Sequence, residues 1–178
     1  MHVSCGVPLA PLTTLGIGGP AASLAELHDL AEFPDFVQEV HHGTTPPVCL
    51  GEGSNVLVDD RGCSLPVLRI ATRGIRVLGP ADDGRVLVEV QAGHPLWDLV
   101  ETLIAEGLAG MEMLAGIPGT TGATPVQNVE RTGRRSPTPC AAWRCGTGHW
   151  AAGSPWTPPS AHWATAPACS RSPDAGPC

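Results

Sequence analysis

The chain has 178 residues, enough for one domain with a tail, and its formal charge of −7 is unevenly distributed. Residues 1–129 hold fifteen Asp and Glu against five Arg and no Lys, whereas residues 130–178 hold five Arg against two acidic residues. An acidic domain without Lys argues against a nucleic-acid partner, and the absence of a signal peptide or a long apolar run argues against secretion or a membrane, so we expect a cytoplasmic protein.

Residues 1–129 alternate short apolar runs with helical patterns. The pattern predicts a helical region over residues 24–40, interrupted near Pro34, and then five strands, at residues 47–50, 56–58, 65–70, 74–78 and 85–90. A second helix is predicted over residues 95–106, beginning at Pro95 and ending before Gly107. We place Trp97 in the buried face of this helix and interpret His94 as the residue that precedes it.

Two glycine-rich loops carry the candidate chemistry. The first loop, residues 50–57, reads LGEGSNVL: Gly51 and Gly53 allow tight turns with positive φ, and Ser54 and Asn55 add polar side chains. Such a turn directs backbone N–H groups at an anion without a lysine. We expect the Glu52 carboxylate to turn outward or to bond to the backbone rather than to act in catalysis.

The second loop, residues 115–128, reads AGIPGTTGATPVQN and contains glycines, hydroxyls and an amide but no charge. Neither loop fits GxGxxG or GxxxxGK[ST], which excludes the Rossmann and P-loop motifs. Taken alone, each loop is better explained as a tight turn. Two donor-rich loops in one short domain, however, suit the two phosphates of a dinucleotide.

The composition changes after Val129. Residues 130–178 contain no Leu, Ile, Val, Phe or Met, but they hold four of the five Trp, four of the seven Cys and eight Pro. Such a segment buries too little apolar surface to offset its ordering entropy, so we expect an unstructured tail.

Cysteine spacing gives no metal site. Cys140, Cys145, His149 and His162 are spaced too irregularly for zinc, so no metal is expected. Cys5, Cys49 and Cys63 lie far apart and are interpreted as half-buried thiols.

Three blocks give a family resemblance: LTTLGIGGPA, LGEGSNVLV and AGHPLWDLVETLIAEGLAGMEMLAGIPGTTGATPVQNV. In this order and at these intervals, residues 12–129 resemble the amino-terminal part of the UDP-N-acetylenolpyruvoylglucosamine reductase (MurB) family of flavin enzymes. The resemblance implies an α+β fold, an incomplete FAD-binding domain of the vanillyl-alcohol oxidase (PCMH) type with an irregular carboxy-terminal tail.

The resemblance also implies a function. FAD would be the cofactor, NADPH the co-substrate, and the reaction would reduce UDP-N-acetylenolpyruvoylglucosamine to UDP-N-acetylmuramate in peptidoglycan synthesis. It assigns no protein partner. The cofactor-binding positions that it implies are Gly51, Gly53, Ser54, Asn55, Ile117, Gly119, Thr120, Gly122, Thr124 and Asn128. We assign no catalytic residue.

The match to the family stops at Val129. The family continues with a GAYGQE-like stretch, a GYR motif and later a serine and a glutamate, and this chain contains no Tyr. We therefore expect the chain to lack the catalytic part and to be inactive as written. Two alternatives stay open: another flavin oxidoreductase of the same fold, and a non-enzymatic remnant that binds a dinucleotide or nothing. The first is disfavoured because relatives that tether flavin through a histidine have it near the first loop, and no His lies between Gly51 and Leu57.

The genetic code suggests why the motifs are missing. Residues 130–136 can be written GAG CGT ACG GGC AGG AGG TC, and one G restored in front gives GGA GCG TAC GGG CAG GAG GTC, which reads GAYGQEV. Residues 163–167 can be written TGG GCT ACC GCA CCA, and with the next GC of Ala168 the same shift gives GGC TAC CGC ACC AGC, which reads GYRTS. The hypothesis is a partial FAD-binding domain over residues 1–129 followed by an out-of-frame tail over residues 130–178. A genuine low-complexity tail is the competing interpretation.

Overall fold

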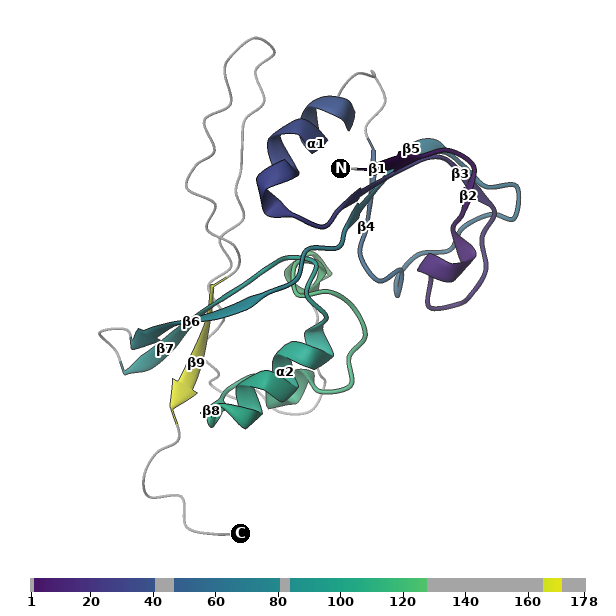
Figure 1. The fold of residues 1–178 in the computed structure, drawn as a ribbon. Helices are drawn as coiled ribbons and strands as arrows, with labels where there is room; N and C mark the ends of the chain where they lie inside the picture. Colours follow the sequence, from purple (N-terminus) through teal and green to yellow (C-terminus); the bar gives the residue numbers. More distant parts are fainter. Residues whose placement is uncertain (1, 41–46, 81–83, 128–164, 171–178) are drawn as a thin grey trace.

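The computed structural model describes residues 2–40, 47–80, 84–127 and 165–170, which form two β-sheets with short helices around them (Figure 1). The first sheet has five strands: β1 (His2–Ser4), β2 (Val7–Pro8), β3 (Pro20–Leu27), β4 (Val48–Leu50) and β5 (Cys63–Ile70). β3 pairs antiparallel with β1 and β2 and parallel with β5, which pairs in parallel with β4. The architecture is α+β, as the sequence predicted.

The second sheet has the strand order β6-β7-β9-β8. Its strands are β6 (Ile75–Pro80), β7 (Arg85–Val90), β8 (Leu108–Ala109) and β9 (Thr165–Ser170), and the three ladders are antiparallel. Helix α2 (Leu96–Ala105) packs against this sheet, and Gly107, whose φ is +71°, follows its C-cap residue Glu106. The predicted strands β4, β5, β6 and β7 and helix α2 are thus confirmed.

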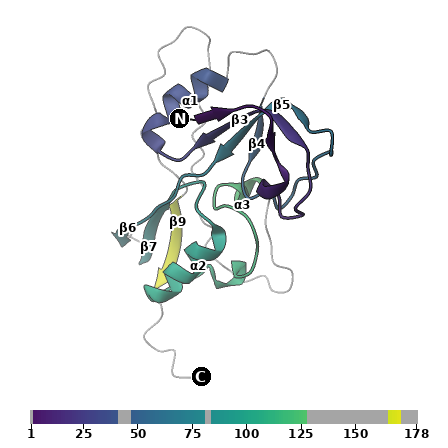
Figure 2. The same cartoon turned by 45° about the vertical axis from the view of Figure 1, so that its right-hand side comes forward.

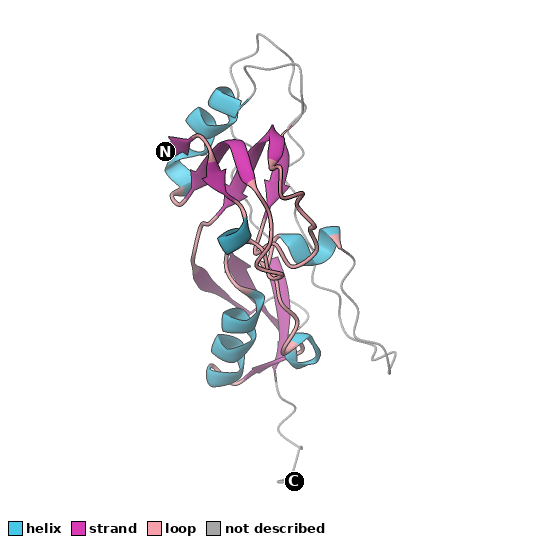
Figure 3. Cartoon of the chain, turned by 90° about the vertical axis from the view of Figure 1, so that its right-hand side faces the viewer, coloured by secondary structure: helices cyan, strands magenta, loops and turns pink. Residues whose placement is uncertain are grey.

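Each sheet has its own apolar core. In the second sheet, Val88 and Val90 from β7 pack against Leu99 and Leu103 of α2. In the first sheet, Leu24 and Val67 are register partners in a cluster that also includes Leu50. The two sheets lie one above the other in Figure 3, and loops cross between them.

The predicted helix over residues 24–40 is wrong in its first half. Residues 20–27 form β3, which lies between β1 and β5 and buries Ala21, Leu24, Ala25 and Leu27. A strand inside a sheet that is covered on both faces shows no simple alternation of apolar and polar residues, so its pattern was mistaken for a helix.

A helix does form in the second half of that region. After a 3₁₀ turn, η2 (Leu30–Glu32), α1 (Phe33–Val40) begins with Pro34 in its first turn, where proline disturbs no helical hydrogen bond. Phe36 packs with Leu27 and Leu68 beneath the sheet. Pro34 therefore lies at the start of the helix instead of interrupting it.

The predicted strand at residues 56–58 is also wrong. The segment has no ladder partner among the described residues, and Val56 and Val58 instead pack against the core that contains Leu50. An apolar run can thus be explained by packing of its side chains on the core alone. Trp97 differs from expectation as well, because it is 46% exposed on α2.

Strand β9 differs from the expectation for residues 130–178. It pairs with β7 from Arg85↔Cys169 to Glu89↔Thr165 and with β8 at Leu108↔Ser170. A ladder is built from main-chain groups, so a segment poor in β-branched and aromatic residues can still occupy this position. The rest of the expected tail, including the cysteines and histidines considered for zinc, lies outside the described residues.

The remaining elements are short: η1 (Ala10–Leu12), η3 (Glu112–Leu114) and α3 (Ala123–Val126). Cys5 and Cys49 are free and exposed, contrary to the half-buried expectation, and Cys63 is free and partly buried. In the ranges that the structure describes, no cluster of His, Cys, Asp and Glu is arranged to hold a metal, and no helix has the length and apolar character of a membrane span.

Candidate dinucleotide-binding site

The structure brings the two glycine-rich loops into contact. The first loop follows β4 and the second precedes and includes α3, which lies between the sheets in Figure 2. A Cβ added to Gly51 would lie 3.0 Å from Thr120 Oγ1, and one added to Gly119 would lie 3.6 Å from Ser54 Oγ. Residues some seventy positions apart in the chain therefore lie side by side, as a shared site for the two loops would require.

The segment that precedes β3, residues 12–14, packs against the first loop. Gly53 has a φ of +66° and its carbonyl accepts a hydrogen bond from Thr14 N–H at 3.1 Å. A Cβ on Gly53 would overlap the carbonyl oxygen of Leu12. Glycine is required here both by the backbone conformation and by the close approach of another segment.

The second loop is fastened to the turn between β7 and α2. Gly119 accepts a hydrogen bond from Leu96 N–H at 2.9 Å, and the His94 carbonyl accepts from both N–H and Oγ1 of Thr121, at 2.8 and 2.9 Å. His94 thus acts through its backbone in positioning this loop, a role that sequence reasoning missed because any residue type supplies a carbonyl.

Several of the expected binding positions have structural roles in the second loop. Gly122 N–H donates to the carbonyl of Ala92 at 2.8 Å, and the Thr124 hydroxyl donates to the carbonyl of Thr120 at 3.0 Å. Ile117 packs against the core of the second sheet. These groups fix the shape of the loop, and any contact they make with a ligand is additional to that role.

The remaining expected positions differ in exposure. Thr120 and Gly119 are buried, Gly51 and Ser54 are partly buried and Asn55 is exposed. Asn128 lies outside the described residues. Of these positions, Ser54 and Gly119 lie beside each other at the contact between the loops.

One charged side chain lies between the loops. Glu52 Oε2 accepts a hydrogen bond from Gly119 N–H at 2.9 Å, so the expectation that Glu52 bonds to the backbone is confirmed. In this contact an amide N–H of the second loop donates a hydrogen bond to an anionic oxygen of the first loop. Charge-assisted hydrogen bonds from backbone N–H groups are the interactions that hold phosphates in lysine-free loops.

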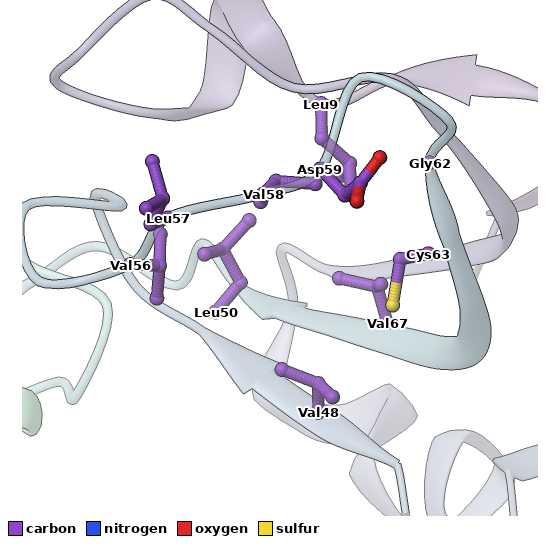
Figure 4. Close-up of a pocket in the computed structure, with 10 residues that line it drawn as sticks. All are labelled: Leu9, Val48, Leu50, Val56, Leu57, Val58, Asp59, Gly62, Cys63 and Val67. Carbon is purple, nitrogen blue, oxygen red and sulfur yellow. The ribbon is translucent and has the colours of Figure 1, made fainter.

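A separate cavity of about 300 Å³ lies behind the first loop (Figure 4). Its walls are apolar, formed by residues such as Leu9, Val48, Leu50 and Val67. Its one carboxylate, Asp59, is paired with Arg61 at 2.8 Å. This cavity lacks the donors that an anionic ligand requires, so the contact between the two loops is the better candidate site.

Comparison with known proteins agrees with this geometry. The chain belongs to the family of FAD binding domains, whose family model matches residues 21–143. The match includes both glycine-rich loops and confirms the FAD-binding fold expected from the sequence.

Among similar proteins, the UDP-N-acetylenolpyruvoylglucosamine reductase of Streptomyces coelicolor is 46% identical over 127 residues, which cover 71% of this chain and 32% of that protein. The reductase of Pseudomonas fluorescens is 39% identical over 130 residues, 72% of this chain and 38% of that protein. The chain spans about a third of the length of the curated relatives it matches.

A solved structure gives the same result. The crystal structure of UDP-N-acetylenolpyruvylglucosamine reductase (MurB) from Thermus caldophilus matches with a TM-score of 0.53 and 34% identity, covering 70% of this chain and 41% of that one. The resemblance to the amino-terminal part of this reductase family is therefore confirmed.

Proposed function

We propose that residues 50–57 and 115–128 bind the diphosphate of FAD. The observation that carries the proposal is the contact between the loops, in which Gly119 N–H already holds an anionic oxygen from Glu52. Gly51, Gly53, Ser54 and Asn55 would bind from one side, and Ile117, Gly119, Thr120, Gly122, Thr124 and Asn128 from the other. Bound FAD would supply hydride transfer, and this chain would supply binding and orientation.

The proposal extends to the reaction of the intact protein. By its similarity to reductases of that name, the intact protein would use FAD and NADPH to reduce UDP-N-acetylenolpyruvoylglucosamine in peptidoglycan synthesis in the cytoplasm. The 178-residue chain would not perform this reaction, because the GAYGQE and GYR motifs of the family are missing from it. Residues 130 to about 169 would be an out-of-frame product of one lost base.

Two features support the frame hypothesis. Residues 130–178 lack Leu, Ile, Val, Phe and Met, and these residues can be written in codons from which a single shift gives both family motifs. Strand β9 pairs with β7 and β8. It nevertheless contains few residues that favour strands, since its sequence is TAPACS.

FAD binding by the 178-residue chain is the direct test of the proposed site. We expect weak binding that Ser54→Ala reduces several-fold, because Ser54 Oγ lies beside Gly119 at the contact between the loops. Ser64→Ala, at an exposed serine of β5, is the matched control and should leave the affinity unchanged. Equal affinities of the two variants would count against this site.

Sequencing of the gene across the Val129 codon tests the frame hypothesis. We expect that restoring one G produces a long open frame and that the repaired protein oxidises NADPH only when the UDP-sugar is present, whereas the 178-residue chain does not. An unbroken frame in several independent reads, or substrate-dependent NADPH oxidation by the 178-residue chain, would contradict the hypothesis.

A further inference from the structure

Glu52 and Gly119 are 67 positions apart, and their hydrogen bond joins the two loops directly. Glu52 is the one charged residue in residues 50–57 and 115–128. Its side chain is partly buried, and its carboxylate lies where the proposed diphosphate site offers an amide. The chain therefore supplies an anion of its own at this site.

A single N–H has one hydrogen to donate. A carboxylate oxygen at 2.9 Å from Gly119 N and a phosphate oxygen cannot both take this hydrogen in good geometry. Two anions that approach the same donor also repel each other, and this repulsion is strong at a partly buried position where water screens it poorly. The carboxylate and the diphosphate are thus alternatives at this amide.

The two partners differ in freedom to move. Gly119 is held by its carbonyl, which accepts from Leu96 N–H at 2.9 Å, and it is buried. Glu52 has a long side chain with several rotatable bonds and retains access to solvent. Exchange of the two anions therefore requires only a rotation of the Glu52 side chain.

We propose that Glu52 is an internal competitor of the dinucleotide: its carboxylate takes the Gly119 amide in the free protein and leaves when the diphosphate binds. This inference rests on the proposed FAD site. In the free protein the contact satisfies a buried N–H that would otherwise lack a partner, and it holds the two loops together. The same contact lowers the affinity for the cofactor.

The test compares the 178-residue chain with Glu52→Gln, which removes the charge at nearly constant shape. Dissociation constants are measured for FAD and for inorganic pyrophosphate. We expect Glu52→Gln to bind both about tenfold more tightly at low salt, with a smaller gain at high salt because the repulsion is screened. Glu101→Gln, at an exposed glutamate of α2, makes the same change in net charge and should bind as the unmodified chain does.

Glu52→Ala distinguishes competition from a purely structural contact. Competition predicts a gain in affinity for Glu52→Ala as well, whereas a contact that only holds the loops in place predicts a loss. Unchanged or weaker binding in both variants, or a gain for FAD without a gain for pyrophosphate, would overturn the inference while leaving the FAD site in place. Absence of FAD binding by every variant and by the unmodified chain would instead overturn the proposed function, and this inference with it.

Discussion

Gly122 lies directly against Ala92. Its N–H donates to the Ala92 carbonyl at 2.8 Å, and a Cβ added to Gly122 would lie only 2.7 Å from Ala92 Cβ. The second loop is therefore fixed to the residues that follow β7 with no room for another methyl group. This relationship gives a packing reason for a glycine that the family resemblance assigned to cofactor binding.

Gly122→Ala should displace the second loop and destabilise the domain by about 1–3 kcal/mol, because a methyl group is forced into a filled space. Ala92→Gly in the same protein should recover part of the loss by removing the opposing Cβ. Chemical denaturation of the four proteins of this double-mutant cycle measures the coupling. Additive effects would show that the two residues do not compete for the same space.

Leu99→Ala should cost about 2–5 kcal/mol of unfolding free energy, since Leu99 is fully buried between α2 and β7. Ile104→Ala is the matched control on the same helix, where the side chain is 53% exposed. We expect Ile104→Ala to lower the unfolding free energy several times less than Leu99→Ala does. Similar losses for both variants would mean that α2 does not bury the face described above.

The ion pair between Glu26 and Arg69 should make a measurable contribution to the first sheet. The two residues are register partners on β3 and β5, Arg69 Nη1 lies 2.6 Å from Glu26 Oε1, and both side chains are partly buried. A double-mutant cycle with Glu26→Gln and Arg69→Met should give a coupling of about 1 kcal/mol that decreases with salt. The exposed pair of Asp59 and Arg61 should show a smaller coupling, and the reverse order would contradict this prediction.

Acid should destabilise the protein through His94. Burial lowers the pKa of His94, the Asp98 carboxylate opposes this effect and Arg73 adds to it. Both ring nitrogens are buried and have no hydrogen-bond partner within the described residues. Because the unfolded chain takes up the proton more readily, stability falls as the pH decreases through about 6.5, and the loss is complete below the folded-state pKa.

His94→Gln should remove this pH dependence, because the new side chain does not titrate. Thermal unfolding between about pH 5 and pH 8 measures how the stability of each protein changes with pH. His28→Gln, at an exposed histidine, is the control and should retain the dependence. A slope that is the same in His94→Gln as in the unmodified chain would assign the effect to another group.

Much of the site was predictable from local sequence. Gly53 has the positive φ that was expected of it, and α2 lies between the predicted proline and glycine signals. The same expectation for Gly51 is wrong, because its φ is not positive and it instead lies close to Thr120 of the second loop. These features depend on short-range sterics and periodicity, which a single sequence displays directly. The family resemblance was also carried by contiguous motifs, and it is confirmed.

Other features were decided only by tertiary structure. The sequence could not place residues 20–27 in the interior of a sheet, because the burial of β3 depends on β1 and β5. It could not pair Glu52 with Gly119 or show that Gly122 contacts Ala92, because each contact joins segments distant in the chain. Local sequence thus determined which residues can turn, donate or pack, whereas long-range packing determined which of these groups meet, since contact energies between distant segments appear only once the backbone has brought them together.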